Sequence, residues 1–304
     1  MDMLQGFGDL FNVGEPSGAG GLKVFPLFPM GPAAIMLRTL RDVVGDGDAR
    51  VEEAADGSGG PWFRALSLVN ESAHVVLVSD GDLLTAGLQD RIVDTPRCVR
   101  PGGRVTLQVS CVEAGRSSRR DRADLVTAER AAEPSVRRRR MLRSLGGGRP
   151  DQQETWDHVA ELRGARGHHD GGGSLAERSA LDERAAAIAA RLPVAYGATG
   201  LAVARNTSKG ARVVLLEWYA DPAACLSAWA PLVRSAAMEV RHPEVDVKIS
   251  RTELRRAVAR AASAVVREEA FAEGDRVAWI GGTGAMTGRA VALGEQLVNV
   301  ALVG

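Results

Sequence analysis

Alternation of apolar and polar residues between Val76 and Arg116 is the feature that most constrains how this chain folds. Over residues 104–112, Val105, Leu107 and their alternate neighbours would share one face of a strand, while polar residues occupy the other. Side chains alternate between the two faces of a strand, so this pattern predicts a half-buried β-strand. Polar residues also concentrate between the apolar ones, beyond what turns require. The stretch therefore predicts either a site or a buried polar network.

Turn signals divide the chain into four parts. Residues 1–21 predict a flexible apolar peptide and tether, and residues 22–116 predict a β-rich region, sandwich-like or an open barrel. Residues 117–150 are rich in arginine and predict a solvated crossover, whereas residues 151–304 mix helix and strand patterns. The last strand is apolar enough to lie inside a sheet. We therefore expect an α+β fold in which residues 22–304 form one compact unit.

Two hairpins are predicted within the β-rich region. Residues 64–70 and 74–80 alternate around a short Asn-Glu-Ser turn, and residues 97–100 and 104–112 flank a Pro-Gly-Gly turn. Apolar segments joined by so few turn residues are typical of adjacent antiparallel strands.

Composition favours a globular protein of the cytoplasm. The chain has 304 residues, of which 45% are hydrophobic and 25% charged, and its 38 basic residues balance 38 acidic ones. Its three cysteines have no CxxC spacing, which predicts free thiols in a reducing compartment. No apolar stretch reaches the roughly 18 residues that cross a bilayer, and the first residues lack the pattern of a secretory signal. We expect no membrane contact.

Acidic residues in the polar stretch are candidate catalytic groups. Asp80 and Asp82 flank a glycine, and Glu113 follows Cys111 near the end of a predicted strand. The two aspartates could act as an acid/base pair or share a divalent cation; alternatively, they belong to a turn, cap backbone amides and pair with Arg91. No residue has zinc-ligand spacing. A core cysteine is favoured over a nucleophile at Cys111, because no histidine is paired with it in the sequence.

A second group of polar residues could bind a ligand. Gln89, Asp90 and Arg91, together with Thr95 and Arg116, could hydrogen-bond a sugar and hold a phosphate, since guanidinium binds oxyanions through two donors. A buried polar network that fixes the strand register is an equally good interpretation.

Two further segments could contact partners. Leu4, Phe7, Leu10 and Phe11 could form one face of a short helix, which needs a groove on this subunit or on another one; a disordered tail is the alternative. The arginines of 117–150 could bind phosphate or nucleic acid. No aromatic residue interleaves with them, so nucleic acid is the least favoured partner.

Several segments resemble a known family. LKVFPLF, SDGDLLTAGLQDRIVDT and VRPGGRVTLQVSCVEAGR are similar to the ARPP-type domain, which is associated with ADP-ribosylglycohydrolase and rhodanese-phosphatase superfamily proteins. PSVRRRR, QETWDHVAEL and RAVALGEQLVNVALVG extend the resemblance over nearly the whole chain after Leu22. The family has no firmly established activity, and its name implies a connection with ADP-ribose or NAD-derived nucleotides.

The chain also departs from the family pattern. It has Asp80-Gly-Asp-Leu-Leu where relatives have Asp-Gly-Glu-Glu-Leu, and Leu88-Gln-Asp-Arg where relatives have Lys-Gln-Asn-Arg. The loss of a lysine and of an acid weakens any catalytic role, so the sequence leaves open whether the protein is an enzyme. Three hypotheses follow: a domain that binds or processes a nucleotide, an interaction protein that self-assembles or docks a partner through its N-terminal peptide, and an RNA-associated factor.

Overall fold

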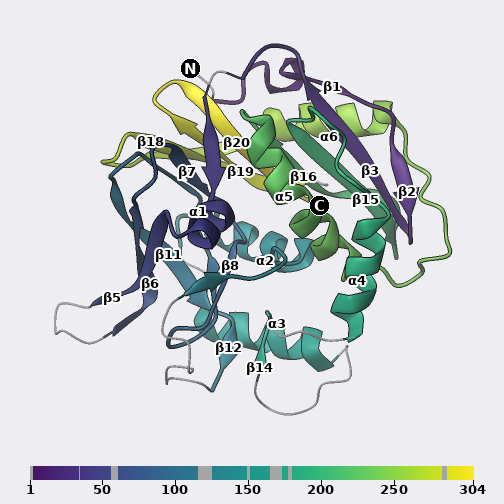
Figure 1. Cartoon of the computed structure of the whole chain (residues 1–304). Coiled ribbons are helices and arrows are strands. Elements are labelled where there is room, and N and C mark those ends of the chain that lie inside the picture. The colour runs from purple at the N-terminus through teal and green to yellow at the C-terminus, as the bar shows by residue number, and fades with distance from the viewer. Residues whose placement is uncertain are drawn as a thin grey trace.

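A nine-stranded antiparallel sheet joins the two ends of the chain (Figure 1). The computed structural model describes residues 3–33, 35–55, 61–115, 125–148, 151–164, 173–176, 180–282 and 286–304. In spatial order the sheet contains β1 (Phe11–Val13), β3 (Leu22–Pro29), β15 (Gly200–Thr207), β16 (Gly210–Tyr219), β20 (Gln296–Val303), β19 (Thr287–Leu293), β18 (Asp275–Ile280) and β17 (Val265–Ala270), with β2 (Ser17–Ala19) paired to β3. The last strand lies between β16 and β19, as its apolar sequence predicts.

Smaller sheets make up the rest of the N-terminal half. A six-stranded sheet contains β13 (Val126–Thr127), β8 (Leu83–Thr85), β9 (Arg91–Val93), β11 (Arg104–Cys111), β6 (Pro61–Asn70) and β5 (Ala49–Ala55). A three-stranded sheet contains β10 (Arg97–Val99), β7 (Val75–Val78) and β4 (Leu37–Thr39). A two-stranded sheet pairs β12 (Glu113–Ala114) with β14 (Gly173–Ser174). The α+β class with a β-rich N-terminal half is therefore confirmed. So is the half-buried β11, whose Val105, Leu107 and Val109 are buried.

Both predicted hairpins are wrong, because each turn carries the chain from one sheet to another. Strand β6 pairs with β11 and β5, whereas β7 pairs with β10 and β4. The buried side chain of Asn70 holds this corner. Its amide donates to the carbonyl oxygens of His74, Val99 and Arg100 at 2.8–3.1 Å. A side chain that bonds backbone groups of two segments replaces the ladder that a hairpin would have formed.

Six α-helices lie among the described residues, and sequence-encoded caps begin several of them. They are α1 (Leu40–Asp46), α2 (Pro134–Ser144), α3 (Gln152–Gly164), α4 (Ala180–Ala190), α5 (Pro222–Ala237) and α6 (Arg251–Ala262). Asp221 accepts a hydrogen bond from the Ala223 amide before α5, and Ser250 forms a capping box with Glu253 at the start of α6. In the described part of the chain, no helix has the length and apolarity to cross a membrane.

Hydrophobic residues fill both faces of the nine-stranded sheet. Alternation along β15 and β16 sends Val203 and Leu215 toward α4 and α5, and Ala202 and Leu216 toward α6. Helix α2 lies on the α5 side, where Met141 joins the core. The two faces of the sheet are therefore covered by different helices.

The N-terminal segment, predicted as a flexible peptide, packs onto the α6 side of this sheet. Phe7, in a short 3₁₀ turn, meets Phe11 and Trp218 edge-on, with ring centroids 5.3 and 5.9 Å apart respectively. Leu4 and Phe11 are also buried, whereas Leu10 is 38% exposed. Burying a large apolar side chain stabilises by about 1.5–3 kcal/mol, so three of them offset much of the entropy lost on ordering the segment. The groove lies on the same subunit.

Candidate functional site

Helix α2 carries the run of four arginines, and its two faces do different things. Arg137 and Arg140 point into the protein and are buried, whereas Arg138 and Arg139 are half-buried on the outer side and Arg143 is exposed. Positions three residues apart lie on the same side of a helix, which explains this division. The predicted crossover therefore supplies both an internal anchor and a surface.

The inner face is anchored by a network of buried ion pairs. Arg137 donates from Nη2 to Oε1 of Glu217 at 2.6 Å, and its Nε lies 3.6 Å from Oδ1 of Asp80. Arg289 on β19 donates to Asp80 from Nη1 and to Ser144 from Nη2, the latter at 2.6 Å. Charged side chains are rarely buried unless they are paired, and here each charge faces an opposite one. Asp80 thus ties α2 to the nine-stranded sheet.

A second buried pair holds the same face of the helix one turn further along. Arg140 donates to Asp94, and also to Oγ1 of Thr155 on α3 at 3.0 Å. Asp94 in turn accepts from Oγ of Ser110 at 2.9 Å. Burial lowers the pKa of Arg140 to about 10, which leaves the guanidinium charged at neutral pH. This pair connects α2 to β11 and α3.

Asp80 and Asp82 line a small hollow, here named the acid cavity, of about 30 Å³ together with Glu217 and Tyr219. Asp82 accepts a hydrogen bond from the Ser79 amide at 2.8 Å. It therefore caps a backbone amide in a turn, as the alternative to an acid/base pair predicts. Burial raises the pKa of Asp82 to about 6 and that of Glu217 to about 7. A cavity of this size holds roughly one or two water molecules and no nucleotide.

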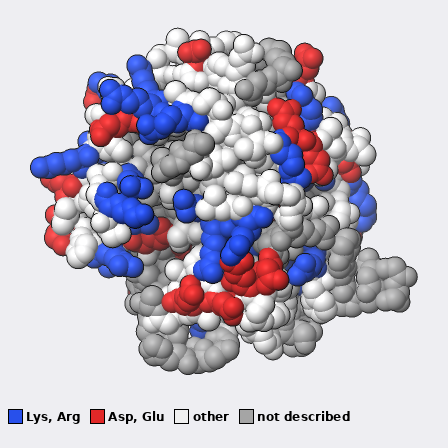
Figure 2. Space-filling model, turned by 180° about the vertical axis from the view of Figure 1, so that it is seen from behind, with Lys and Arg blue, Asp and Glu red and all other residues white. Residues whose placement is uncertain are grey.

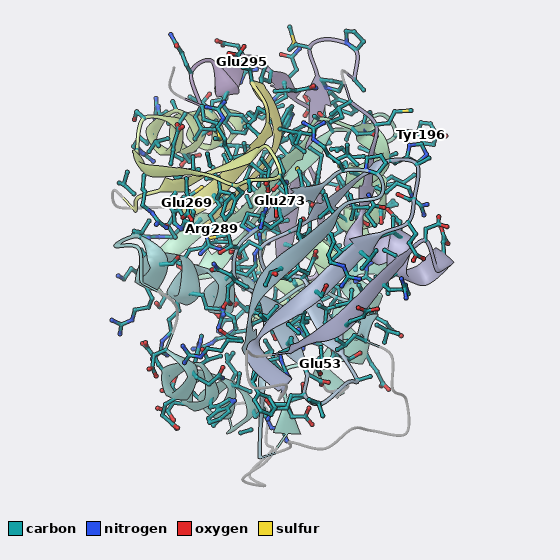
Figure 3. The ribbon with its side chains drawn as sticks, turned by 90° about the vertical axis from the view of Figure 1, so that its left-hand side faces the viewer. Glu53, Tyr196, Glu269, Glu273, Arg289 and Glu295 are labelled. Carbon is teal, nitrogen blue, oxygen red and sulfur yellow. The ribbon has the colours of Figure 1, made fainter. Side chains whose placement is uncertain are left out.

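The other candidate residues lie in a separate buried cluster. The Asp90 amide donates to Oε2 of Glu113 at 3.1 Å, and Arg91, opposite Cys111 on β11, lies 3.6 Å from Glu53. Gln89 is buried beside them. Figure 3 shows Glu53 well apart from Arg289, the partner of Asp80. The structure therefore brings Gln89, Asp90, Arg91 and Glu113 together, whereas Asp80 and Asp82 line the acid cavity. The expected pairing with Arg91 is wrong for Asp80, whose partners are Arg137 and Arg289.

The remaining candidates have plain structural surroundings. Thr95 is buried and donates to Oε1 of Gln108 at 3.4 Å, while Arg116 lies outside the described residues. Burial raises the pKa of the Cys111 thiol, which contacts the Phe63 carbonyl oxygen at 3.6 Å. Such a thiol is a poor nucleophile. Across the described ranges, no group of three or more His, Cys, Asp or Glu side chains could hold a metal ion.

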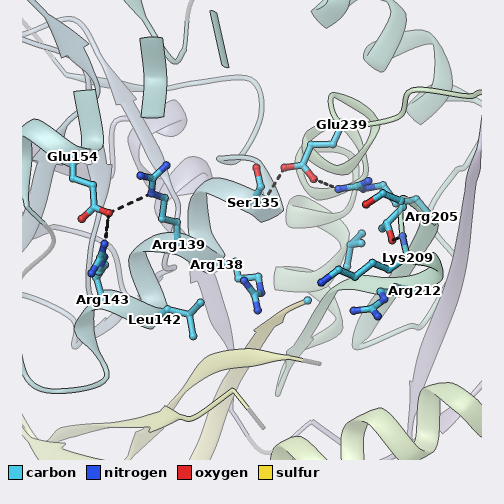
Figure 4. A pocket seen from close by; sticks show the side chains of 14 residues that line it. Ser135, Arg138, Arg139, Leu142, Arg143, Glu154, Arg205, Lys209, Arg212 and Glu239 are labelled. Carbon is cyan, nitrogen blue, oxygen red and sulfur yellow. Dashed lines mark hydrogen bonds and ion pairs between the residues drawn. The ribbon is translucent and has the colours of Figure 1, made fainter. Parts of the chain in front are cut away.

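A much larger pocket of about 720 Å³ opens between the outer face of α2 and the β15–β16 hairpin (Figure 4). It is called the basic pocket here because cations predominate in its lining. It contains two carboxylates, Glu154 and Glu239. Six side chains are cationic: Arg138, Arg139, Arg143, Arg205, Lys209 and Arg212.

Half of these cations are already paired. Arg143 donates to Oε1 of Glu154 at 2.7 Å and Arg139 does so at 3.4 Å, while Arg205 donates to Oε2 of Glu239 at 2.5 Å. The hydrogen bond from Arg143 lowers the pKa of Glu154, which keeps it ionised.

Three cations of the pocket are left without a carboxylate. Within the part of the chain that the structure describes, Arg138, Lys209 and Arg212 form no ion pair. Figure 4 shows Arg138 between the two glutamates, with Lys209 and Arg212 on the hairpin side. This arrangement can bind an oxyanion.

The basic pocket is a site that the sequence analysis missed. Its two halves are visible separately in the sequence, as the arginine run and as the turn-forming segment Asn206-Thr-Ser-Lys-Gly. Only the packing of α2 beside β20 brings them together. On the face shown in Figure 2, basic side chains form separate groups with acidic ones next to them. This mixed charge suits a small anionic ligand better than a long polyanion.

Comparison with known proteins gives one match. Residues 11–303 match the family model of the ARG and rhodanese-phosphatase-superfamily-associated protein domain, ARPP-1, which extends over nearly the whole chain. No curated protein and no solved structure matches the chain.

Proposed function

The chain belongs to the ARPP-1 domain family, and from this premise we propose that its basic pocket binds an ADP-ribose- or NAD-derived nucleotide. The family name supports ADP-ribose-related ligands, and the cationic lining of the basic pocket supports this pocket as their binding site. The proposal concerns binding. Of the candidate catalytic carboxylates, Asp80 and Asp82 line the acid cavity and Glu113 accepts from the Asp90 amide, and none of the three lines the basic pocket.

The three unpaired cations of the basic pocket carry this proposal. Arg138, Lys209 and Arg212 present many N–H donors and three positive charges to one volume, and phosphate oxygens are the acceptors that such groups bind best. The volume of about 720 Å³ falls within the roughly 300–1,000 Å³ range of small-molecule sites. A diphosphate would supply the negative charge that the pocket lacks.

Calorimetric titration with ADP-ribose tests the proposal. Arg138→Gln, Lys209→Gln and Arg212→Gln remove one charge each. Because hydrogen bonds to charged groups contribute about 1.5–3 kcal/mol, we expect each change to weaken binding about tenfold or more. Arg255→Gln is the matched control, since Arg255 is an exposed arginine of α6 on the opposite side of the sheet. Absence of binding to the unaltered protein, or equal effects of all four changes, would refute the proposal.

The second hypothesis, assembly through the N-terminal peptide, requires buried apolar side chains to become exposed. Leu4, Phe7 and Phe11 are buried in their own subunit, so a peptide free to dock elsewhere must first expose them. We expect light scattering on the full chain to give the monomer mass across a wide concentration range. A mass that rises with concentration would favour assembly instead.

The third hypothesis, RNA association, is tested by the same protein in a different assay. The alternating basic and acidic groups of Figure 2 provide no continuous positive track for a phosphate backbone. We expect weak RNA retention that disappears at moderate salt. Tight retention that weakens steeply and linearly with the logarithm of salt concentration would support an RNA-associated factor.

A further inference from the structure

We propose that Glu239 is a positioning residue for the basic pocket: it fixes the distance between the two cationic walls, so that unpaired cations from both walls bind one phosphate group together. The walls are the outer face of α2 and the β15–β16 hairpin, and Glu239 lies between them just after the end of α5 (Figure 4). This role rests on the nucleotide binding proposed above, whose affinity it sets.

Each carboxylate oxygen of Glu239 bonds a different wall of the pocket. Oε1 accepts from the Ser135 amide in the first turn of α2 at 2.8 Å, and Oε2 accepts from Nη2 of Arg205 on β15 at 2.5 Å. The Glu239 side chain is only 9% exposed, and hydrogen bonds to a charged group are strengthened by shelter from water. Glu239 therefore ties the helix that carries Arg138 to the hairpin that carries Lys209.

Helix α2 takes this cap from a remote part of the chain. Glu133 occupies its N-cap position, but the Glu133 side chain makes no capping hydrogen bond and instead lies 3.2 Å from Arg130. The first amides of a helix have no partner within the helix, and a carboxylate near them also interacts favourably with the helix dipole. Glu239 supplies that carboxylate, whereas α6 has its own capping box of Ser250 and Glu253.

The backbone at Glu239 is anchored on both sides. Its neighbours Met238 and Val240 are buried in the core, so position 239 cannot shift without displacing them. The Glu239 amide also donates to the carbonyl oxygen of Ala236 in the last turn of α5, at 3.3 Å. A carboxylate on such a fixed backbone holds the two walls at a constant separation.

Charge alone predicts that losing Glu239 would favour an anionic ligand. Six cations and two carboxylates line the basic pocket, so removing one carboxylate makes the lining more positive and releases Arg205 from its partner. Position has the opposite effect. Without the bridge, like charges on the two walls repel each other and the first turn of α2 loses a hydrogen bond. A ligand must then gather Arg138 and Lys209 itself, which lowers affinity, and we expect this effect to dominate.

Calorimetric titration with ADP-ribose tests the role of Glu239. We expect Glu239→Ala to weaken binding about tenfold, and Glu239→Gln, which keeps an acceptor for the Ser135 amide, to weaken it about threefold. Glu253→Ala is the matched control, because it removes the carboxylate of a helix cap on α6 that does not line the pocket. It should lower the thermal unfolding midpoint without changing the affinity.

A double-mutant cycle shows whether Glu239 acts through Arg138. In the Arg138→Gln background, Glu239→Gln should change the affinity by less than about 1.5-fold, because the wall that Glu239 positions has lost its unpaired cation. A residue that served stability alone would produce no such dependence of one effect on the other.

The outcomes separate this role from the proposed function. If ADP-ribose binds the unaltered protein, and binds Glu239→Ala and Glu239→Gln equally or more tightly, the positioning role is overturned while the binding function stands. Equal losses for Glu239→Gln with and without Arg138→Gln also overturn it. If ADP-ribose does not bind the unaltered protein, the proposed function fails and the role of Glu239 fails with it.

Discussion

Arg137 donates a hydrogen bond to Oε1 of Glu217 at 2.6 Å in a part of the core where neither side chain is exposed. The next residue along α2, Arg138, lines the basic pocket. Of these two consecutive arginines, one forms a buried ion pair and the other lines a surface pocket. The acids that pair with the inner arginines determine where the outer arginines stand.

Arg137→Met should destabilise the protein far more than Arg138→Met. Removing Arg137 leaves Glu217 and Asp80 with less compensation in the core, and breaking a buried pair costs about 3–5 kcal/mol. Arg138 has no ion-pair partner among the described residues, so its replacement should change stability by about 0.5 kcal/mol or less. Urea denaturation measures both. Similar losses for the two variants would show that the inner pairs do not anchor α2.

Glu217→Gln should change how stability depends on pH. Burial raises the pKa of Glu217 from 4.5 to about 7 in the folded protein. A raised pKa means that the folded state binds the proton more tightly, so its contribution to stability is present below about pH 4.5 and is lost as pH rises through about 7. The variant lacks this loss. Relative to the unaltered protein, its unfolding free energy should therefore rise by on the order of 3 kcal/mol across that window.

The measurement for Glu217→Gln is denaturation at a series of pH values, with Glu295→Gln as the control. Glu295 is exposed, and its replacement should give a curve parallel to that of the unaltered protein. Parallel curves for Glu217→Gln as well would contradict the buried proton-binding group.

Phe7→Ala should cost about 3–5 kcal/mol, because it empties a space between Phe11, Trp218 and α6. Leu10→Ala, in the same segment but exposed, should cost well under about 1 kcal/mol. Thermal or urea unfolding of the two variants distinguishes a packed segment from a loose one. If both have small effects, the N-terminal segment contributes little to the core.

Gly81→Ala should be more damaging than Gly47→Ala, although both glycines have a positive φ. A methyl group at Gly81 would lie 2.7 Å from Cδ of Arg137, whereas nothing lies within 4 Å of the same position at Gly47. Both changes incur about 1 kcal/mol or more of backbone strain, but only the first displaces the buried arginine. Unfolding free energies of the two variants test this difference, and equal values would argue against the close contact.

Local signals in the sequence predicted local structure well. The alternation of Val105, Leu107 and Val109 identified a half-buried strand, and the capping box of Ser250 and Glu253 that begins α6 is an equally local pattern. Such features depend on residues a few positions apart, which a single sequence displays directly. The hairpins failed for a related reason. A short turn shows that the chain changes direction, but the partner of each strand is set by distant segments.

The burial of the arginine run could not be predicted from neighbouring residues alone. Four consecutive charges predict a solvated segment, because charged residues are seldom buried without partners. The partners of Arg137 and Arg140 are Asp80, Glu217 and Asp94, which are remote in the sequence. Of these acids the sequence analysis identified only Asp80, and it did so as a candidate catalytic residue. Only the folded arrangement pairs the two groups, and the outer arginines become a pocket as a result.

The place of β20 between β16 and β19 has a consequence for the order of events during synthesis. Until the ribosome has made residues 296–303, both neighbouring strands keep an open edge, however long the preceding chain has been outside the exit tunnel. Unpaired edges invite contact with other nascent chains. We therefore expect the sheet to close late, and chaperone dependence to be greatest for translation intermediates that lack this strand.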